Sequence, residues 1–406
     1  MKNSYPFKKR FFSSISVFIS IYIGLFITDT YLVANKLDIH KTFKIKKNYE
    51  NLKNKDFSLM EEAKKSNFKA NFLPNKLKST GDKFQIYPIG TLPNENIYYC
   101  NEGYGLIKYK SDRFGLRNND LIWENQNITS NNLNFFIGDS FTQGACVDDQ
   151  NTIPNLYNKI SEFPSINLGH ADNGPYEYIN LLRSIVKPIL DLNKNKVYVN
   201  LIFYPNDEEL KDLNSEYLLS RNYQIINFDN FSYSSEIKVS DSYKNNIQRI
   251  INDYSIKSKD INTYKRTYNF LNRLKLVGLR KYLGYPAYII KKIIFTNFAE
   301  TPTAYAIDEL KKICNKNCIP TVVFIPMPDF PRIIYGSKLY NKNIKDYTDK
   351  LGIRFLDLTY VLNTKNFNSD YPPRGEYQAE GTFHLSKSGY KKVSEYLYKF
   401  LIETNF

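Results

Sequence analysis

Residues 133–144 read LNFFIGDSFTQG and give the first indication of the fold. The apolar run 133–137 has the length and composition of a short buried strand, and it leads directly into Gly138, Asp139 and Ser140. A helix should follow, because Asp and Ser are common helix-capping residues. In an open parallel sheet, ligands bind beyond the carboxyl ends of the strands. A serine at such a position can attack a carbonyl carbon while a main-chain N–H holds the oxyanion.

Further short apolar runs, separated by helical stretches, continue this pattern along the chain. The strand candidates are 165–168, 196–204, 320–326 and 353–358, and the helical stretches are 152–162, 176–192 and 304–315. Such alternation is typical of a parallel sheet with helices on both faces. We therefore expect an α/β fold, a three-layer α/β/α sandwich with about five parallel strands in flavodoxin-like order.

The composition is that of a packed globular protein. With 42% hydrophobic and 24% charged residues in a chain of 406, it lacks the bias of disordered proteins. The formal net charge of +15 fits an anionic membrane surface, an anionic glycan or nucleic acid, or a general bias toward lysine. The arginines are scattered and the sequence has no recognisable nucleic-acid-binding motif, so we expect no nucleic-acid partner.

The cysteines and histidines give little support for a metal centre. The three histidines, His40, His170 and His384, are too few for a His-based site. Four cysteines are too few for a disulfide scaffold in a chain of this length. Cys314 and Cys318 have no second Cys or His pair nearby to complete a zinc site, and they form either a local disulfide outside the cytosol or two free thiols. We expect no metal and no organic cofactor.

The N-terminus has the pattern of a membrane-targeting element. Basic residues within 1–10 precede the uncharged, apolar run 11–28. As a helix this run would span about 27 Å, close to the hydrocarbon thickness of a bilayer. The basic flank favours a cytoplasmic tail at 1–10, a transmembrane signal-anchor at 11–34 and a catalytic domain on the periplasmic or extracellular side of the cytoplasmic membrane. A cleaved signal peptide is the alternative, although 31–34 lacks small residues at both cleavage positions.

The remaining chain divides into a lead-in and a main domain. Residues 35–130 form a juxtamembrane and lead-in segment, whose part from 84 onward alternates short apolar pieces with turn signals such as Gly115-Leu116-Arg117-Asn118. We expect this part to be irregular or β-rich. Residues 131–406 form the main domain. Its stretch at about 208–300 has no clear strand, which predicts a mostly helical insertion.

Motifs on three loops carry a family resemblance. The Gly-Asp-Ser turn resembles the first motif of the SGNH (GDSL-like) hydrolases. The stretch Phe203-Tyr204-Pro205-Asn206-Asp207, after the third strand, resembles their Gly-x-Asn-Asp block. Residues 383–390 (FHLSKSGY) resemble their last block, a histidine followed by a polar turn, a glycine and a helix. The three motifs occur in the family's order and cover residues 131–400.

The resemblance implies a serine esterase. Ser140 would be the nucleophile, His384 the base that takes its proton, and the Asn206 amide a donor to the oxyanion. An imidazole with a pKa near neutrality suits a general base at physiological pH. Water would complete hydrolysis of the acyl-enzyme, or a sugar hydroxyl would complete an acyl transfer.

Two positions depart from the family pattern. In the second block, 167–174 (NLGHADNG), Asp172 stands at the middle glycine, so the N–H donor is retained there or supplied by Gly174 or Gly169. The family's acid, three residues before the histidine, is replaced by Gly381. Glu380 lies one residue earlier and would complete a triad if its longer side chain reaches. Otherwise the site is a Ser-His dyad, is weakened, or is inactive.

The sequence thus predicts an esterase or O-acyl transferase acting on acylated envelope glycans or lipids, held to the membrane by its N-terminal helix. One alternative is a catalytically silent SGNH-like module that binds glycan during assembly of an envelope polymer. Another is an envelope scaffold whose basic insertion binds anionic lipid.

Overall fold

The computed structural model describes residues 16–28, 65–71, 89–100, 106–129, 132–208, 226–227, 238–239, 297–314, 318–326, 334–362, 370–371 and 384–403. The chain divides into two compact units. One comprises Tyr49–Tyr254 and Asn297–Phe406, and it contains the sheet and the candidate site. The other comprises Met1–Asn48 and Ser255–Thr296, and within it the structure describes the helix over residues 16–28.

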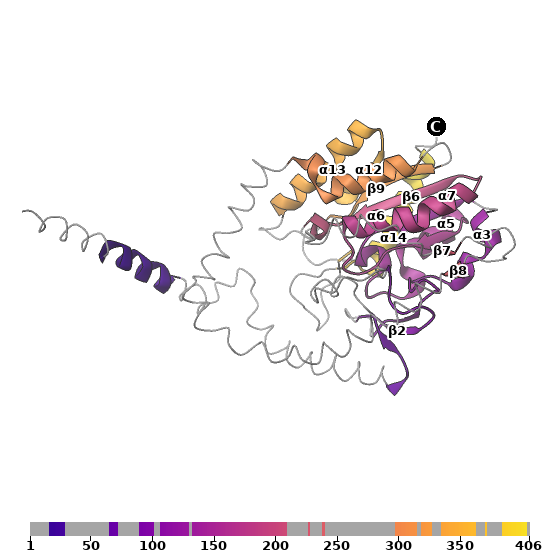
Figure 1. The fold of residues 1–406 in the computed structure, drawn as a ribbon, viewed down its shortest axis with the longest axis horizontal. Helices are drawn as coiled ribbons and strands as arrows, with labels where there is room; N and C mark the ends of the chain where they lie inside the picture. Colours follow the sequence, from indigo (N-terminus) through magenta and orange to yellow (C-terminus); the bar gives the residue numbers. More distant parts are fainter. Residues whose placement is uncertain are drawn as a thin grey trace, which may run out of the picture. The chain divides into compact units, whose positions relative to one another are not determined.

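A five-stranded parallel sheet forms the centre of the larger unit (Figure 1). Its strands lie in the order β10-β9-β6-β4-β5, and every neighbouring pair is parallel. This is the flavodoxin-like order, so the predicted topology is confirmed. The strands are β4 (Leu133–Ile137), β5 (Ser165–Asn167), β6 (Val197–Phe203), β9 (Cys318–Phe324) and β10 (Arg354–Asp357).

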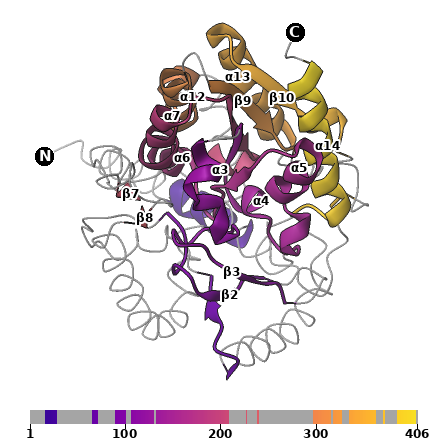
Figure 2. The same cartoon turned by 90° about the vertical axis from the view of Figure 1, so that its right-hand side faces the viewer.

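Helices cover both faces of this sheet, which confirms the three-layer sandwich. Figure 2 shows α6, α7 and α12 on one side of the sheet and α5 and α14 on the other. Along β4, Phe135 packs into the first layer and Phe136 into the second, because successive strand residues point to opposite faces. Burial on both faces explains why the interior strands β4 and β6 are mainly apolar along their whole length. The helices are α5 (Ile153–Ser161), α6 (Pro175–Leu181), the π-helical η4 (Leu182–Val186), α7 (Lys187–Leu192), α12 (Pro302–Ile313), α13 (Ile334–Leu351) and α14 (Lys387–Glu403).

The lead-in contains a small sheet, as its sequence suggested. Strands β1 (Lys69–Ala70), β2 (Asn96–Tyr98) and β3 (Lys108–Lys110) pair in that order, and η2 (Asp120–Trp123) and α3 (Asn125–Thr129) follow them. The turn at Gly115 requires glycine, since its φ is +80° and a Cβ there would lie 2.0 Å from the Thr91 carbonyl oxygen. Trp123 is fully buried behind this turn, and its indole N–H donates to Asp112 Oδ2 at 2.8 Å.

The helix over residues 16–28 covers most of the apolar run that predicted a membrane anchor. Within the described part of the chain, no helix has the combination of length and apolar character that crossing a membrane requires. Residues 1–15 and 29–64 lie outside the described residues, so the predicted signal-anchor stays a prediction.

The predicted insertion at 208–300 is described only in part. Two short strands, β7 (Ile226–Asn227) and β8 (Lys238–Val239), pair antiparallel within it, and the sequence analysis did not predict them. The 3-10 turn η7 (Phe298–Glu300) lies at its end. The rest of the insertion falls outside the described ranges, and its predicted helical character stays untested.

All four cysteines are in disulfides. Cys314–Cys318 joins the end of α12 to the start of β9, which decides between the two alternatives that the sequence left open. Cys100–Cys146 ties the lead-in to the loop after the Gly-Asp-Ser turn. This second disulfide was not predicted, because a sequence separation of 46 leaves no local signal.

Candidate active site

Ser140 begins a one-turn helix, α4 (Ser140–Gln143), at the carboxyl end of the interior strand β4. Asp139 caps this helix, because its side chain accepts a hydrogen bond from the Phe141 N–H at 2.9 Å. Position 138 has to be glycine, because a Cβ there would lie 2.1 Å from Thr142 Oγ1. The Gly-Asp-Ser sequence therefore builds the tight strand-to-helix turn that presents Ser140.

His384 lies beside Ser140 although 244 positions separate them in the sequence. Its Nε2 is 2.8 Å from Ser140 Oγ, so the hydroxyl can donate to a neutral imidazole. Two residues after His384, Ser386 caps α14 by accepting from the Gly389 N–H at 3.0 Å. The Phe141 ring packs against the imidazole with a centroid distance of 5.0 Å. The predicted nucleophile and base are thus brought together.

Asn206 lies in η5 (Pro205–Glu208), the turn at the carboxyl end of β6. Because β6 and β4 are parallel neighbours, this turn and the Ser140 turn lie at the same edge of the sheet. The Tyr204 N–H donates to Asp207 Oδ2 at 2.9 Å and closes the turn. Asn206 Oδ1 is buried and has no hydrogen-bond partner among the described residues. The amide is therefore not engaged through its oxygen.

The second loop of the site follows β5 and contains Gly169, Asp172 and Gly174. The Gly169 N–H donates to Asn167 Oδ1 at 2.9 Å, and the Gly174 N–H donates to Glu177 Oε2 at 2.9 Å. Both predicted glycine donors therefore already have acceptors in this structure. Asp172 has a φ of +65°, the left-handed conformation that favours glycine.

This second loop lies directly against α4. The His170 N–H donates to the Gly138 carbonyl at 3.2 Å, and the Ala171 N–H donates to Gln143 Oε1 at 2.9 Å. A Cβ at Gly169 would lie 2.4 Å from the Gln143 main-chain nitrogen. The turn that carries Ser140 and the second loop therefore hold each other in position.

Burial controls the titration of the groups behind the serine. It raises the pKa of Asp139 to about 6, against the opposing effects of the Phe141 N–H and of His384. Burial, and then the charge of Asp139, also raise the pKa of Asp207 well above its usual value. The charges of Asp139 and of a protonated His384 attract each other, and a protonated imidazole is the form that a general base reaches after accepting a proton.

His170 is not an alternative to His384 as the general base. Burial lowers its pKa to about 4, so the ring is neutral at physiological pH, and its Nδ1–H donates to the Ala171 carbonyl at 3.1 Å. Glu380 and Gly381 lie outside the described residues, as does His40, so the third member of a triad stays a prediction. The described residues include no cluster of His, Cys, Asp and Glu side chains that could hold a metal ion.

Sequence reasoning missed three residues that contact the site loops. Arg117 and Asn118 lie in the lead-in turn, and Gln143 ends α4. The turn signal at 115–118 was recognised, but it gave no indication that these side chains reach the serine turn and the loop after β5.

Comparison with known proteins gives only distant similarity. No protein-family model matches the chain, and no curated protein matches it. A structure from Desulfitobacterium hafniense, named as a lipolytic protein of the G-D-S-L family, is similar at 14% identity and a TM-score of 0.31, over 66% of this chain and 99% of its own. A family 3 carbohydrate esterase from Clostridium thermocellum is similar at 14% identity and a TM-score of 0.31, over 67% and 95%. Similarity this low says nothing about the activity of this chain.

Proposed function

We propose that this chain is a serine esterase in which Ser140 attacks an ester carbonyl and His384 accepts its proton. The observation that carries the proposal is the 2.8 Å distance between Ser140 Oγ and His384 Nε2 at the carboxyl end of β4. Attack forms the Oγ–carbonyl bond, and collapse of the tetrahedral intermediate expels the alcohol, which takes the proton from His384. Water then hydrolyses the acyl-enzyme, or a sugar hydroxyl accepts the acyl group.

Main-chain and amide N–H groups would hold the oxyanion. As the first residue of α4, Ser140 has an N–H that the helix itself does not use, and the Asn206 amide comes from the adjacent turn. For the third donor we propose an N–H of the loop after β5, at Asp172, Gly169 or Gly174; both glycines donate to side chains in this structure, so either would have to exchange its acceptor for the oxyanion. A carboxylate of Asp172 that lies near the oxyanion would oppose the developing charge, and Asp172→Asn should then raise kcat.

The acid that orients His384 is the open part of the mechanism. We propose a Ser-His pair with Glu380 as its third member. Glu380→Gln retains the size of the side chain and removes its charge, so it should lower kcat on the order of 100-fold if the carboxylate pairs with His384. A rate within about threefold of the wild type would instead identify a dyad, and Gly381→Asp should then be tolerated.

The substrates we propose are acylated glycans or lipids of the cell envelope, met outside the cytoplasmic membrane. Two features support this location: the basic flank before the apolar run 11–28, and two disulfides, which persist in oxidising compartments. A reporter fused to the C-terminus should be active only in the exported compartment. Reporter activity in the cytoplasm would overturn the proposed topology.

The esterase proposal is tested on the full chain in detergent with a serine-reactive fluorophosphonate. The wild type should be labelled on Ser140, and Ser140→Ala and His384→Ala should abolish measurable labelling. Ser388→Ala, an exposed serine at the start of α14, should label as the wild type does. A wild type that resists the probe would refute the esterase and leave the silent glycan-binding module in its place.

Hydrolysis and transfer are separated by their products. With a chromogenic short acyl ester, an esterase releases free acid at the rate of alcohol release. Added sugar acceptors should instead yield acylated sugar if transfer operates. Loss of both products in Ser140→Ala would assign the two outcomes to the same acyl-enzyme.

A further inference from the structure

The lead-in turn at 112–118 is built rigidly around a buried carboxylate. Asp112 Oδ1 accepts from the Phe114 and Leu116 N–H groups at 2.9 and 2.8 Å, and its Oδ2 accepts from Trp123 Nε1 at 2.8 Å. With Gly115 in the left-handed conformation, the turn presents its last two residues, Arg117 and Asn118, to the loop after α4 and to the end of β5.

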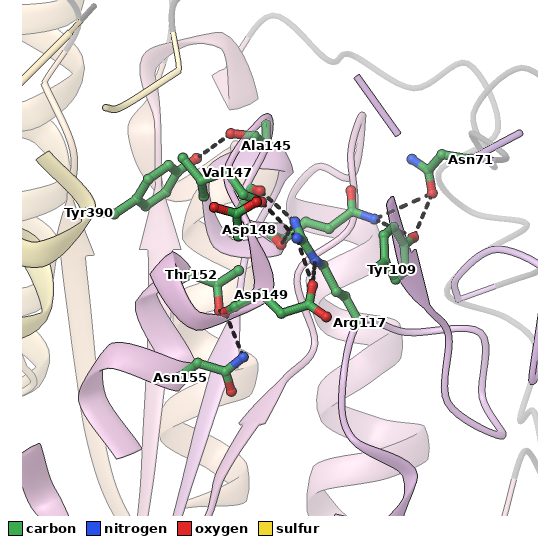
Figure 3. Close-up of polar contacts among 12 residues, drawn as sticks. Asn71, Tyr109, Arg117, Ala145, Val147, Asp148, Asp149, Thr152, Asn155 and Tyr390 are labelled. Carbon is green, nitrogen blue, oxygen red and sulfur yellow. Dashed lines mark hydrogen bonds and ion pairs between the residues drawn. The ribbon is translucent and has the colours of Figure 1, made fainter. Parts of the chain in front are cut away.

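Arg117 reaches the loop that follows α4, the helix that begins with the proposed nucleophile Ser140 and is called the nucleophile helix (Figure 3). Its Nη1 donates to the Gly144 carbonyl at 2.6 Å, its Nη2 to the Val147 carbonyl at 2.7 Å, and its Nε to Asp149 Oδ1 at 2.7 Å. The guanidinium also lies 4.9 Å from the centroid of the Tyr109 ring. The arginine side chain is 2% exposed, whereas the Asp149 side chain is 55% exposed.

This arrangement does for α4 what the helix cannot do alone. A single helical turn is not stable by itself, and its last carbonyl groups lack partners within the helix. Arg117 lies at the C-terminal end of α4, where its guanidinium reaches the carbonyl of the last helical residue, Gln143, at 3.4 Å and donates to the carbonyls of Gly144 and Val147 in the segment that follows. Burial of a guanidinium is costly unless its donors are satisfied. The hydrogen bonds of Arg117 to the loop after α4 offset this cost.

Asn118 holds the second loop in a different way. Its Oδ1 accepts from the Asn167 N–H at 2.7 Å, and its Nδ2 donates to the Asn167 carbonyl at 3.0 Å and to Asp112 Oδ2 at 2.8 Å. The side chain thus pairs with edge strand β5 at its last residue, as a neighbouring strand would. Asn167 Oδ1 in turn accepts from Gly169, which fixes the start of the loop.

Gln143 joins the two loops to each other and to the lead-in. Its Oε1 accepts from the Ala171 N–H at 2.9 Å, and its Nε2 donates to the Tyr109 hydroxyl at 3.2 Å. The side chain is completely buried. The nucleophile helix, the loop after β5 and the lead-in sheet therefore meet at one amide.

From this geometry we propose that Arg117 and Asn118 are positioning residues. Arg117 holds the nucleophile helix and Asn118 holds the loop after β5, so that the two keep the relative position that catalysis requires. The lead-in is then a part of the active site and not a spacer. The inference rests on the proposed esterase function for its kinetic consequences. Its structural consequence, that each residue holds a different loop, does not depend on that function.

The test uses the full chain and two matched pairs of variants. Arg117→Met is compared with Arg113→Met, because Arg113 forms its ion pair with Asp120 of the lead-in at 2.6 Å. Asn118→Ala is compared with Asn119→Ala, whose side chain caps η2 by accepting from the Leu121 N–H at 3.1 Å. Arg117→Lys keeps the charge and serves if the methionine variant does not fold.

Hydrogen exchange measured by mass spectrometry gives the structural readout. Arg117→Met should raise exchange in 140–149, and Asn118→Ala should raise it in 167–174, each more than in the other segment. The two controls should leave both segments as in the wild type. Equal exchange in variant and control would overturn the inference, whether or not the chain is an esterase.

Fluorophosphonate labelling gives the kinetic readout. The final labelled fraction reports how much protein is folded, whereas the rate constant reports how well the site is aligned. Both positioning variants should lower the rate constant by about 10- to 100-fold, with Arg117→Lys intermediate. A lower labelled fraction with an unchanged rate constant would show a merely structural role and refute the proposal. No labelling of the wild type would refute the esterase, and hydrogen exchange would still decide the role of the pair.

Discussion

Gly169→Ala adds one methyl group where the second loop meets the nucleophile helix. The new Cβ would lie 2.4 Å from the Gln143 nitrogen and 2.5 Å from Thr142 Cβ, whereas ordinary contact begins near 3.4 Å. The loop must therefore move away from α4 by about 1 Å, a misplacement that can cost about 100-fold in rate. Overpacking should also lower the free energy of unfolding by about 1–3 kcal/mol.

The assay separates these two effects. Turnover of a chromogenic short acyl ester and the rate constant of fluorophosphonate labelling measure the site, and urea unfolding measures stability. Gly352→Ala is the matched control: its φ of +64° strains an alanine by about 1–2 kcal/mol, yet no atom lies within 4 Å of the added methyl. It lies at the amino end of β10, away from Ser140, so it should lose stability and keep its activity.

The outcomes are distinct. Under the proposed mechanism Gly169→Ala should lose kcat with little change in KM, because the loop would act on the transition state and not on substrate binding. If Gly169→Ala retains a labelling rate within threefold of Gly352→Ala, the loop does not align the oxyanion donors. The assignment of the second block to the active site would then be wrong.

Replacing Cys100 and Cys146 together by serine should lower the free energy of unfolding by about 4 kcal/mol in urea, as expected for a closed loop of 46 residues, and an unchanged midpoint would contradict this. The hydrogen bond and charge of Arg183 lower the pKa of Glu309, so the pair stabilises the fold above pH 4.5 and loses that contribution as the pH falls further. Glu309→Gln should therefore flatten the acid side of the stability profile, by less than about 1 kcal/mol because solvent screens the pair, and an identical profile would show that the pair contributes nothing. Gly115→Ala should destabilise by about 2–5 kcal/mol, from backbone strain and from contact with the chain opposite, and thermal unfolding near the wild-type temperature would count against the rigid turn.

The centre of the sheet was predictable because strands β4 and β6 are buried on both faces. Each of the five strands lies within two residues of its predicted range, and the Ser140 and His384 motifs lie at the expected strand and helix ends. Burial selects continuous apolar runs such as 133–137, which a local reading of the sequence detects. The motif order then predicted that Ser140 and His384, the proposed nucleophile and base, would meet, and their side chains lie 2.8 Å apart.

The remaining features depend on contacts that leave no local pattern. Cys100 and Cys146 meet because the lead-in folds back onto the loop after α4, and no spacing rule indicates this pairing. Arg117 has the sequence context of an exposed turn, yet its side chain is almost fully buried. A polar residue whose donors are satisfied by distant carbonyl groups looks the same in sequence as one that faces water. The short pair β7 and β8 likewise lacks the apolar alternation of a predictable hairpin.

The 244 positions between Ser140 and His384 have a consequence for the order of folding. Closing so long a loop carries a large entropic cost, which the packing of α14 against α5 must offset before the two side chains meet. During synthesis the serine turn leaves the ribosome well before the helix that follows His384. A chain still being synthesised therefore carries Ser140 without His384 beside it, and under the proposed mechanism the serine would become reactive only when α14 docks.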